Sequence, residues 1–132
     1  MKAQGRQWGA IDLIKLYTIS NEENWIDALK KCFETRDVTR LQKLLYGIQC
    51  GMDDLVKKKM DTDKMRLFFV WLQRTLEKTA KAVFTTIYPS PLDNPKYAIQ
   101  MKKFDTVEYQ KWIRTKRKRD AEFEKWRKGA SY

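Results

Sequence analysis

The residues of this chain whose types and spacing could do chemistry lie in the segment 109–128, which mixes cations with aromatic rings. At helical spacing Trp112 and Trp126 stand two heptads apart, and Arg119 lies midway between them on the same stripe. A core-facing helix would carry Leu or Ile at that middle position. A cation there indicates that something anionic, or an acidic surface, completes the face. Tyr109, Lys116 and Phe123 repeat the pattern on the same stripe.

Phosphate binding is the chemistry that such cations can perform. Basic side chains crowd the turns between residues 111 and 119, where they repel one another unless counter-charges are close. Each phosphate that a cation neutralises releases condensed counterions, so affinity for DNA or RNA would fall steeply with salt. Tryptophans between the cations could add base stacking, at about 1–3 kcal/mol per base. The predicted phosphate-binding residues are Lys111, Arg114, Lys116, Arg117, Lys118, Arg119, Arg127 and Lys128, the predicted stacking residues are Trp112 and Trp126, and a secondary basic patch is Lys57, Lys58 and Lys59.

Catalytic chemistry has few candidates in this sequence. The chain contains no histidine, so the usual proton carrier of hydrolases and a common zinc ligand are both missing. Its five glycines form neither a GxGxxG motif nor a P-loop. We therefore predict a protein that is not an enzyme and that uses no metal or cofactor. The alternative is a magnesium-dependent nuclease built on carboxylates that otherwise read as capping or solvated groups, namely Glu22, Glu23, Asp53, Asp54, Asp61 and Asp63.

The length of the chain predicts one small domain, and its charge predicts a polyanionic partner. The 132 residues include 28 basic and 17 acidic side chains, giving a net charge of +11. Residues 89–132 carry 12 of these bases and 6 of these acids. No apolar run could span a bilayer, and the first residues lack the apolar core of a signal peptide, so we expect no membrane partner and a cytoplasmic location, or host cytoplasm for a viral protein. The two cysteines, Cys32 and Cys50, are too few for a disulfide scaffold and should be reduced and partly buried.

Apolar residues recur at helical spacing along most of the chain. We expect helical segments over about residues 10–19, 20–35, 37–60 and 64–87, a short segment over 97–104 and a terminal helix. In the first segment, the apolar face should contain Ile11 and Ile14. The expected N-terminal caps are Ser20 with Glu23, Asp37, the cluster Asp61–Asp63, and Asp105 with Glu108.

Two further patterns concern packing. The segment 64–87 carries a long apolar stripe. Leu67 and Val70 lie outside that stripe, so the first half of the segment is apolar on nearly every side. Such a helix is usually central, so the other helices should pack against it. Gly47 and Gly51 form a GxxxG spacing, which in lipid favours helix dimerisation but in an amphipathic helix lets a neighbouring backbone approach closely. We favour the second interpretation.

These observations predict an all-α protein, a small bundle of four to five helices. Three prolines fall within seven residues and should end the helix before them, which suggests a core at residues 1–88, a connector at 89–95 and a basic helical arm at 96–132. The predicted function is non-catalytic nucleic-acid binding with weak sequence specificity. The alternative is a structural or assembly protein, such as a viral or mobile-element accessory component, whose aromatic and basic terminal helix packs on another copy or on an acidic partner.

Overall fold

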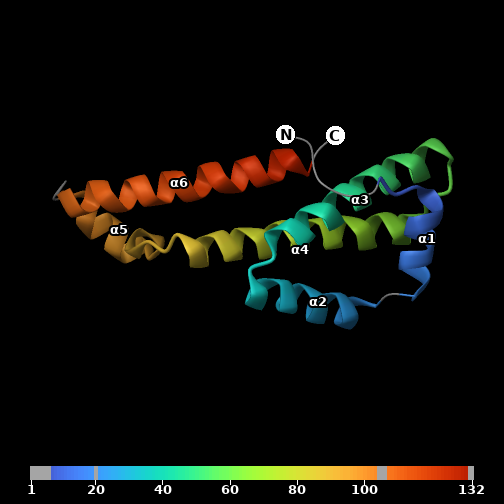
Figure 1. The fold of residues 1–132 in the computed structure, drawn as a ribbon, viewed down its shortest axis with the longest axis horizontal. Helices are drawn as coiled ribbons and strands as arrows, with labels where there is room; N and C mark the ends of the chain where they lie inside the picture. Colours follow the sequence, from blue (N-terminus) through green and yellow to red (C-terminus); the bar gives the residue numbers. More distant parts are fainter. Residues whose placement is uncertain (1–6, 20, 104–106, 131–132) are drawn as a thin grey trace.

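The chain is folded into α-helices connected by short turns (Figure 1). The computed structural model describes residues 7–19, 21–103 and 107–130. The all-α prediction is confirmed, since no strand occurs in those ranges, and they contain six α-helices where four to five were expected. The elements are α1 (Ala10–Ile19), α2 (Glu22–Thr35), α3 (Val38–Lys57), α4 (Asp63–Ile87), the 3-10 turn η1 (Pro91–Asp93), α5 (Pro95–Lys102) and α6 (Val107–Gly129).

Short polar side chains begin three of the central helices. Asp37 caps α3 and Thr62 caps α4, each accepting a hydrogen bond from the backbone N–H three residues on. Both caps lie where the sequence placed them. Asn21 caps α2 in the same way. The other two expected caps, Ser20 and Asp105, lie outside the described residues.

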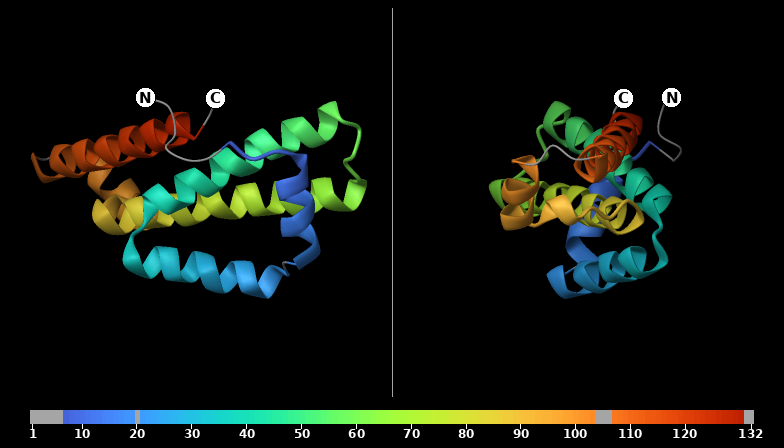
Figure 2. Two further views of the ribbon diagram at one scale, coloured as in Figure 1. Left: turned by 45° about the vertical axis from the view of Figure 1, so that its right-hand side comes forward. Right: turned by 90° about the vertical axis from the view of Figure 1, so that its left-hand side faces the viewer.

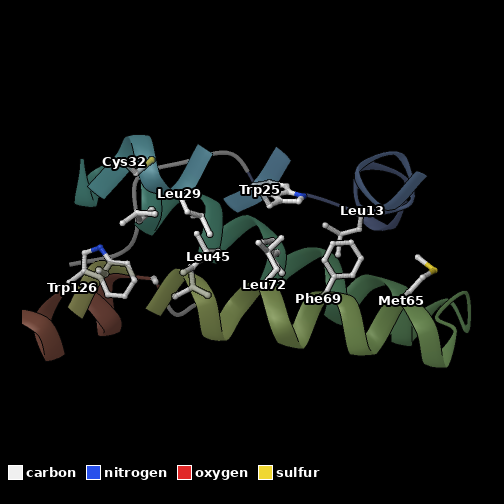
Figure 3. Close-up of a cluster of buried hydrophobic side chains, with 14 of the residues drawn as sticks. Leu13, Trp25, Leu29, Cys32, Leu45, Met65, Phe69, Leu72 and Trp126 are labelled. Atoms are coloured by element: carbon white, nitrogen blue, oxygen red, sulfur yellow. The ribbon is translucent and has the colours of Figure 1, made fainter. Parts of the chain in front are cut away.

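Helix α4 is the element against which most of the others pack, as predicted. It contacts α2, α3 and α6, and its buried stripe faces the side chains of α2 in Figure 3. The apolar residues of its first half are not covered on every side, because Leu67 is 73% exposed and Val70 38% exposed. One stripe is enough to make the helix central. Its buried residues are Met65, Phe69, Leu72, Leu76, Ala80, Val83 and Phe84.

The two glycines of α3 admit the first helix. A Cβ atom at Gly47 would come within 3.0 Å of the ring of Trp8, and one at Gly51 would come as close to the side chain of Leu13. Close approach is therefore confirmed, although side chains rather than a backbone fill the space. This packing also corrects the predicted face of α1: Leu13 is fully buried on Gly51, whereas Ile11 is 55% exposed.

Helix α6 returns along the molecule and docks its last turns on α3 and α4 (Figures 1 and 2). The Nε1 atom of Trp126 donates a hydrogen bond of 2.7 Å to the carbonyl of Val38, and Gln42 donates one of 2.8 Å to the carbonyl of Trp126. The ring of Phe123 stacks on Trp126 and meets Phe84 of α4 edge-on. The aromatic side chains at this end of α6 thus belong to the core.

Candidate nucleic-acid interface

The exposed cations of α6 lie along one side of the helix. Positions 111, 114, 118, 121, 125 and 128 alternate in steps of three and four residues, which keeps them on one face, and all of them are exposed. Five of the six carry a cation, Ala121 being the exception. Arg117 is also exposed and lies three residues from both Arg114 and position 120, beside this face. We call the following residues the outer stripe: Lys111, Arg114, Arg117, Lys118, Lys125 and Lys128.

The outer stripe is long and is not neutralised by the residues that the structure describes. From Lys111 to Lys128 it extends over about 26 Å at the helical rise of about 1.5 Å per residue. No ion pair joins any of its cations to an acid among the described residues. The acids of α6 lie along both flanks of the outer stripe: the exposed Asp120 and Glu124 on one side, the half-buried Glu122 and the exposed Glu108 on the other. Glu124 is 3.6 Å from Arg127.

Arg119 faces the other way and is part of the fold. Its residue exposure is 7%, and its two terminal nitrogens each donate a hydrogen bond of 2.8 Å to the carboxylate of Asp93 in η1. A third, longer bond of 3.4 Å reaches the carbonyl of Tyr88. The hydrogen bonds from Arg119 hold the pKa of Asp93 below its usual range. The anion that completes this stripe therefore comes from the chain itself, and Arg119 is not exposed for phosphate.

Three other predicted cations have neighbours within the protein. Lys116 is exposed and adds to the electrostatic lowering of the Asp93 pKa, so it lies on the side of the connector rather than on the outer stripe. Arg127 lies 3.9 Å from Glu77 of α4. Lys118 keeps its place on the outer stripe while its ammonium lies 5.5 Å from the centre of the Tyr88 ring.

The two predicted stacking residues are not on the exposed basic face. Trp126 is 5% exposed and hydrogen-bonded to α3. Trp112 is half-buried, and its Nε1 atom is buried without a hydrogen-bond acceptor among the described residues. The ammonium of Lys111 lies 5.3 Å from the centre of the Trp112 ring. Neither indole is in a position to act as an open platform for a base.

The secondary patch is separate from the outer stripe. Lys57, Lys58 and Lys59 are exposed where α3 ends, and Lys58 lies 3.1 Å from Asp54. The α3–α4 turn is at one end of the long axis, while α5 and the start of α6 are at the other (Figures 1 and 2). The three lysines and the first half of α6 thus do not form one continuous surface.

Three of the six carboxylates considered for metal chemistry have structural partners. Asp54 accepts a hydrogen bond of 2.8 Å from the backbone N–H of Ala10 at the start of α1, and this bond is the main cause of its lowered pKa. Asp61 and Asp63 both pair with Arg66 of α4. Within residues 7–19, 21–103 and 107–130, no three acidic or cysteine side chains gather as a metal-binding group. The same described ranges contain no helix long and apolar enough to cross a membrane.

Lys125 is the outer-stripe residue that the sequence reasoning missed. It follows Lys118 by seven residues and precedes Lys128 by three, so the spacing that joins the other cations also includes it. Local charge density is highest in the run that ends at Arg119, and Lys125 lies outside that run. Spacing therefore identifies the exposed face better than local charge density does.

Comparison with known proteins supplies no relative. No protein-family model, no curated protein sequence and no solved structure matches this chain.

Proposed function

We propose that this protein binds nucleic acid without catalysis, through the outer stripe of α6. The observation that carries the proposal is the row of six exposed cations for which the described residues supply no ion-pairing acid. Cations arranged in this way lose little on meeting phosphates, because no internal salt bridge must first be broken. Each phosphate contact gains from counterion release.

Binding of this kind is electrostatic and weakly specific. The exposed side of α6 offers lysine and arginine at turn after turn, and these contact phosphates of any sequence. The net charge of +11 adds a long-range attraction that speeds encounter with a polyanion. Lys116, on the side of the connector, adds only to the overall positive charge, whereas Arg119 and Trp126 act by holding α6 in place.

In this proposal, three segments of the chain have different roles. Residues 1–88 supply most of the core, residues 89–95 connect, and residues 96–132 act as a basic helical arm. Arg119 fixes this arm to Asp93 of the connector, and Trp126 fixes it to the core. A fixed arm presents its cations in one geometry, which lowers the entropy lost on binding. We place the protein in the cytoplasm, the compartment expected from its sequence.

A charge-matched pair of variants tests the proposal. The first replaces Arg114, Arg117 and Lys125 by alanine, and the control replaces Lys30, Lys31 and Lys64, which are exposed on α2 and α4. Both remove three positive charges from helical positions. We expect the stripe variant to flatten the plot of log affinity against log salt by about 2.7, at about 0.9 per lost phosphate contact on duplex DNA. The assay is fluorescence anisotropy of labelled DNA and RNA across a salt series.

The control variant decides what the result means. It should keep nearly the whole salt dependence of the unmodified protein, since only its overall charge has changed. Equal losses in the two variants would show that net charge alone is responsible and would refute the assignment to α6. Absence of binding by the unmodified protein at about 0.15 M salt would refute the proposed function itself.

A second candidate function, assembly with further copies of the chain, has one observation in its favour. A groove of about 320 Å³ lies between α2 and α4, and on its rim Ile26 is 50% exposed and Phe33 39% exposed. Grooves of this kind accept apolar side chains from a neighbouring helix. The aromatic layer formed by Phe123 and Trp126 is already packed within the chain, so assembly would use this groove in its place.

Sedimentation in a salt series tests this second function. Because copies of a chain with a charge of +11 repel one another, screening by salt should raise the molar mass if assembly occurs. Replacing Ile26 by aspartate should abolish the increase. A monomer at every salt concentration would eliminate assembly and leave the outer stripe unaffected.

A further inference from the structure

We infer that the outer stripe binds double-stranded nucleic acid through its phosphates in preference to single strands. This inference rests on the proposed function and names the substrate class of the same site. Three observations carry it: the placement of the aromatic rings, the fixed line of cations, and the position of the acids on α6.

The first observation is that the exposed basic face lacks aromatic rings. Tyr109, Trp112 and Phe123 are half-buried and Trp126 is buried, all on the side of α6 that also carries the buried Arg119. Proteins that prefer single strands stack successive bases on aromatic side chains. The rings nearest the outer stripe, Trp112 and Tyr88, are half-buried beside the ammonium groups of Lys111 and Lys118, so an unpaired base would meet no open ring there. A single strand therefore gains phosphate contacts from this surface and no stacking.

The second observation is that the cations form a line of fixed length. Residues 111 to 128 belong to one continuous helix, so the line is about 26 Å long before any ligand binds. A duplex presents about one charge per 1.7 Å of its axis in a regular array, whereas each strand alone presents about one per 3.4 Å. A flexible single strand would have to be ordered along the helix, which opposes binding. The duplex meets the line with its charges already arranged.

The third observation concerns how α6 can lie on a duplex. Asp120 and Glu124 are exposed along one flank of the cations, and Glu122 and Glu108 lie along the other. If α6 entered a groove, phosphates would face the helix from both sides and would meet these acids. Contact with a single line of phosphates keeps the acids away from the second strand. The inferred mode is therefore docking along a backbone, without reading of base edges.

The test compares a 20-base-pair DNA duplex with one of its own strands, using the full-length protein. With about six phosphate contacts, the salt slope should be about −5.4 for the duplex and about −4.2 for the strand. Because the two slopes differ by about 1.2, the preference for the duplex should grow by about 16-fold for every tenfold decrease in salt. Duplexes of only A·T or only G·C pairs should bind within about threefold of each other, since the base edges are not read.

A tryptophan variant provides an independent measurement. Trp112→Leu removes the half-buried ring nearest the start of the outer stripe, and thermal melting checks that the variant is folded. We expect its affinity for the single strand to be unchanged. A stacked base would instead give a loss of at least about fivefold, and that loss would overturn the inference.

The outcomes separate this inference from the proposed function. Binding of the single strand as tightly as the duplex, or more tightly, overturns the duplex preference while nucleic-acid binding stands. A difference of more than about tenfold between the two duplex sequences overturns the backbone mode, since base edges would then contribute. If neither duplex nor strand binds, the proposed function and this inference fail together.

Discussion

The contact between Arg119 and Asp93 should be the most important polar interaction holding α6 to the proline-containing connector. It joins residues 26 positions apart through two hydrogen bonds of 2.8 Å. We propose to replace Asp93 by alanine, Arg119 by methionine, and both together. Methionine keeps much of the apolar stem of the arginine, so the comparison reports mainly on the charged group.

The expected magnitudes follow from the exposure of the two side chains. The side chain of Arg119 is 9% exposed and that of Asp93 34% exposed. Breaking a fully buried ion pair typically costs about 3–5 kcal/mol, and we reduce that figure because water reaches the carboxylate. Asp93→Ala leaves a buried guanidinium without its counter-charge and should cost about 2–3 kcal/mol. Arg119→Met leaves a carboxylate that water can solvate and should cost about 1–2 kcal/mol.

The assay is urea unfolding of the four proteins, read as a double-mutant cycle. A coupling free energy of about 1–2 kcal/mol at pH 7 is expected. Because Arg119 lowers the pKa of folded Asp93, the stabilisation is present above the unfolded pKa of about 3.9 and is lost as the pH falls through the lower folded value. The difference between the unmodified protein and Asp93→Ala should therefore shrink below about pH 4. A coupling near zero, or one independent of acid pH, would refute the reasoning.

Three further predictions concern buried groups of the core and α6. Gly51→Ala should destabilise the protein by about 1–2 kcal/mol in urea unfolding, because overlap with the α1 side chain outweighs the helix propensity gained; increased stability would contradict the packing. Trp112→Phe, which loses no hydrogen bond, should cost less than about 1 kcal/mol, whereas Trp126→Phe should cost about 1–3 kcal/mol; equal costs would contradict the assigned bonds. Burial raises the pKa of the thiols of Cys32 and Cys50, so both should react slowly with a thiolate-selective reagent until urea is added, and their contribution to stability should be lost above about pH 8.5; fast reaction in the native protein would contradict their burial.

The sequence was sufficient for features set by neighbouring residues. Period and capping predicted α3 and α4 closely, because the apolar stripes are long and Asp37 and Thr62 bond to N–H groups only three residues away. The GxxxG spacing predicted that another part of the chain approaches α3 closely. That prediction does not depend on which segment approaches, because a glycine leaves space for any neighbour. The face of α1 could not be predicted, because Leu13 is selected by the space above Gly51 in another helix.

The candidate site was harder to predict, because which cations are exposed depends on tertiary contacts. The sequence pattern placed Arg119 in an aromatic stripe and indicated an anionic partner. Asp93, 26 residues earlier in a proline-rich turn, provides that partner. No local rule connects the two positions. The same reasoning assigned Trp126 to base stacking, whereas its Nε1 atom has a hydrogen-bond acceptor on α3, 88 residues away.

Helix α6 carries a buried cation and exposed cations, and the two kinds differ in whether the described residues supply a counter-charge. Where the fold needs a buried cation, the chain supplies an acid at hydrogen-bond distance, as Asp93 does for Arg119. Within the described part of the chain, none of the six outer-stripe cations receives such a partner, although Asp120 and Glu124 stand on the same helix. Like charges at three- and four-residue spacing destabilise a helix, so this arrangement opposes folding. The described residues do not supply the counter-charge for the outer stripe; small ions supply it in the free protein and, in our proposal, the phosphates of a duplex replace them.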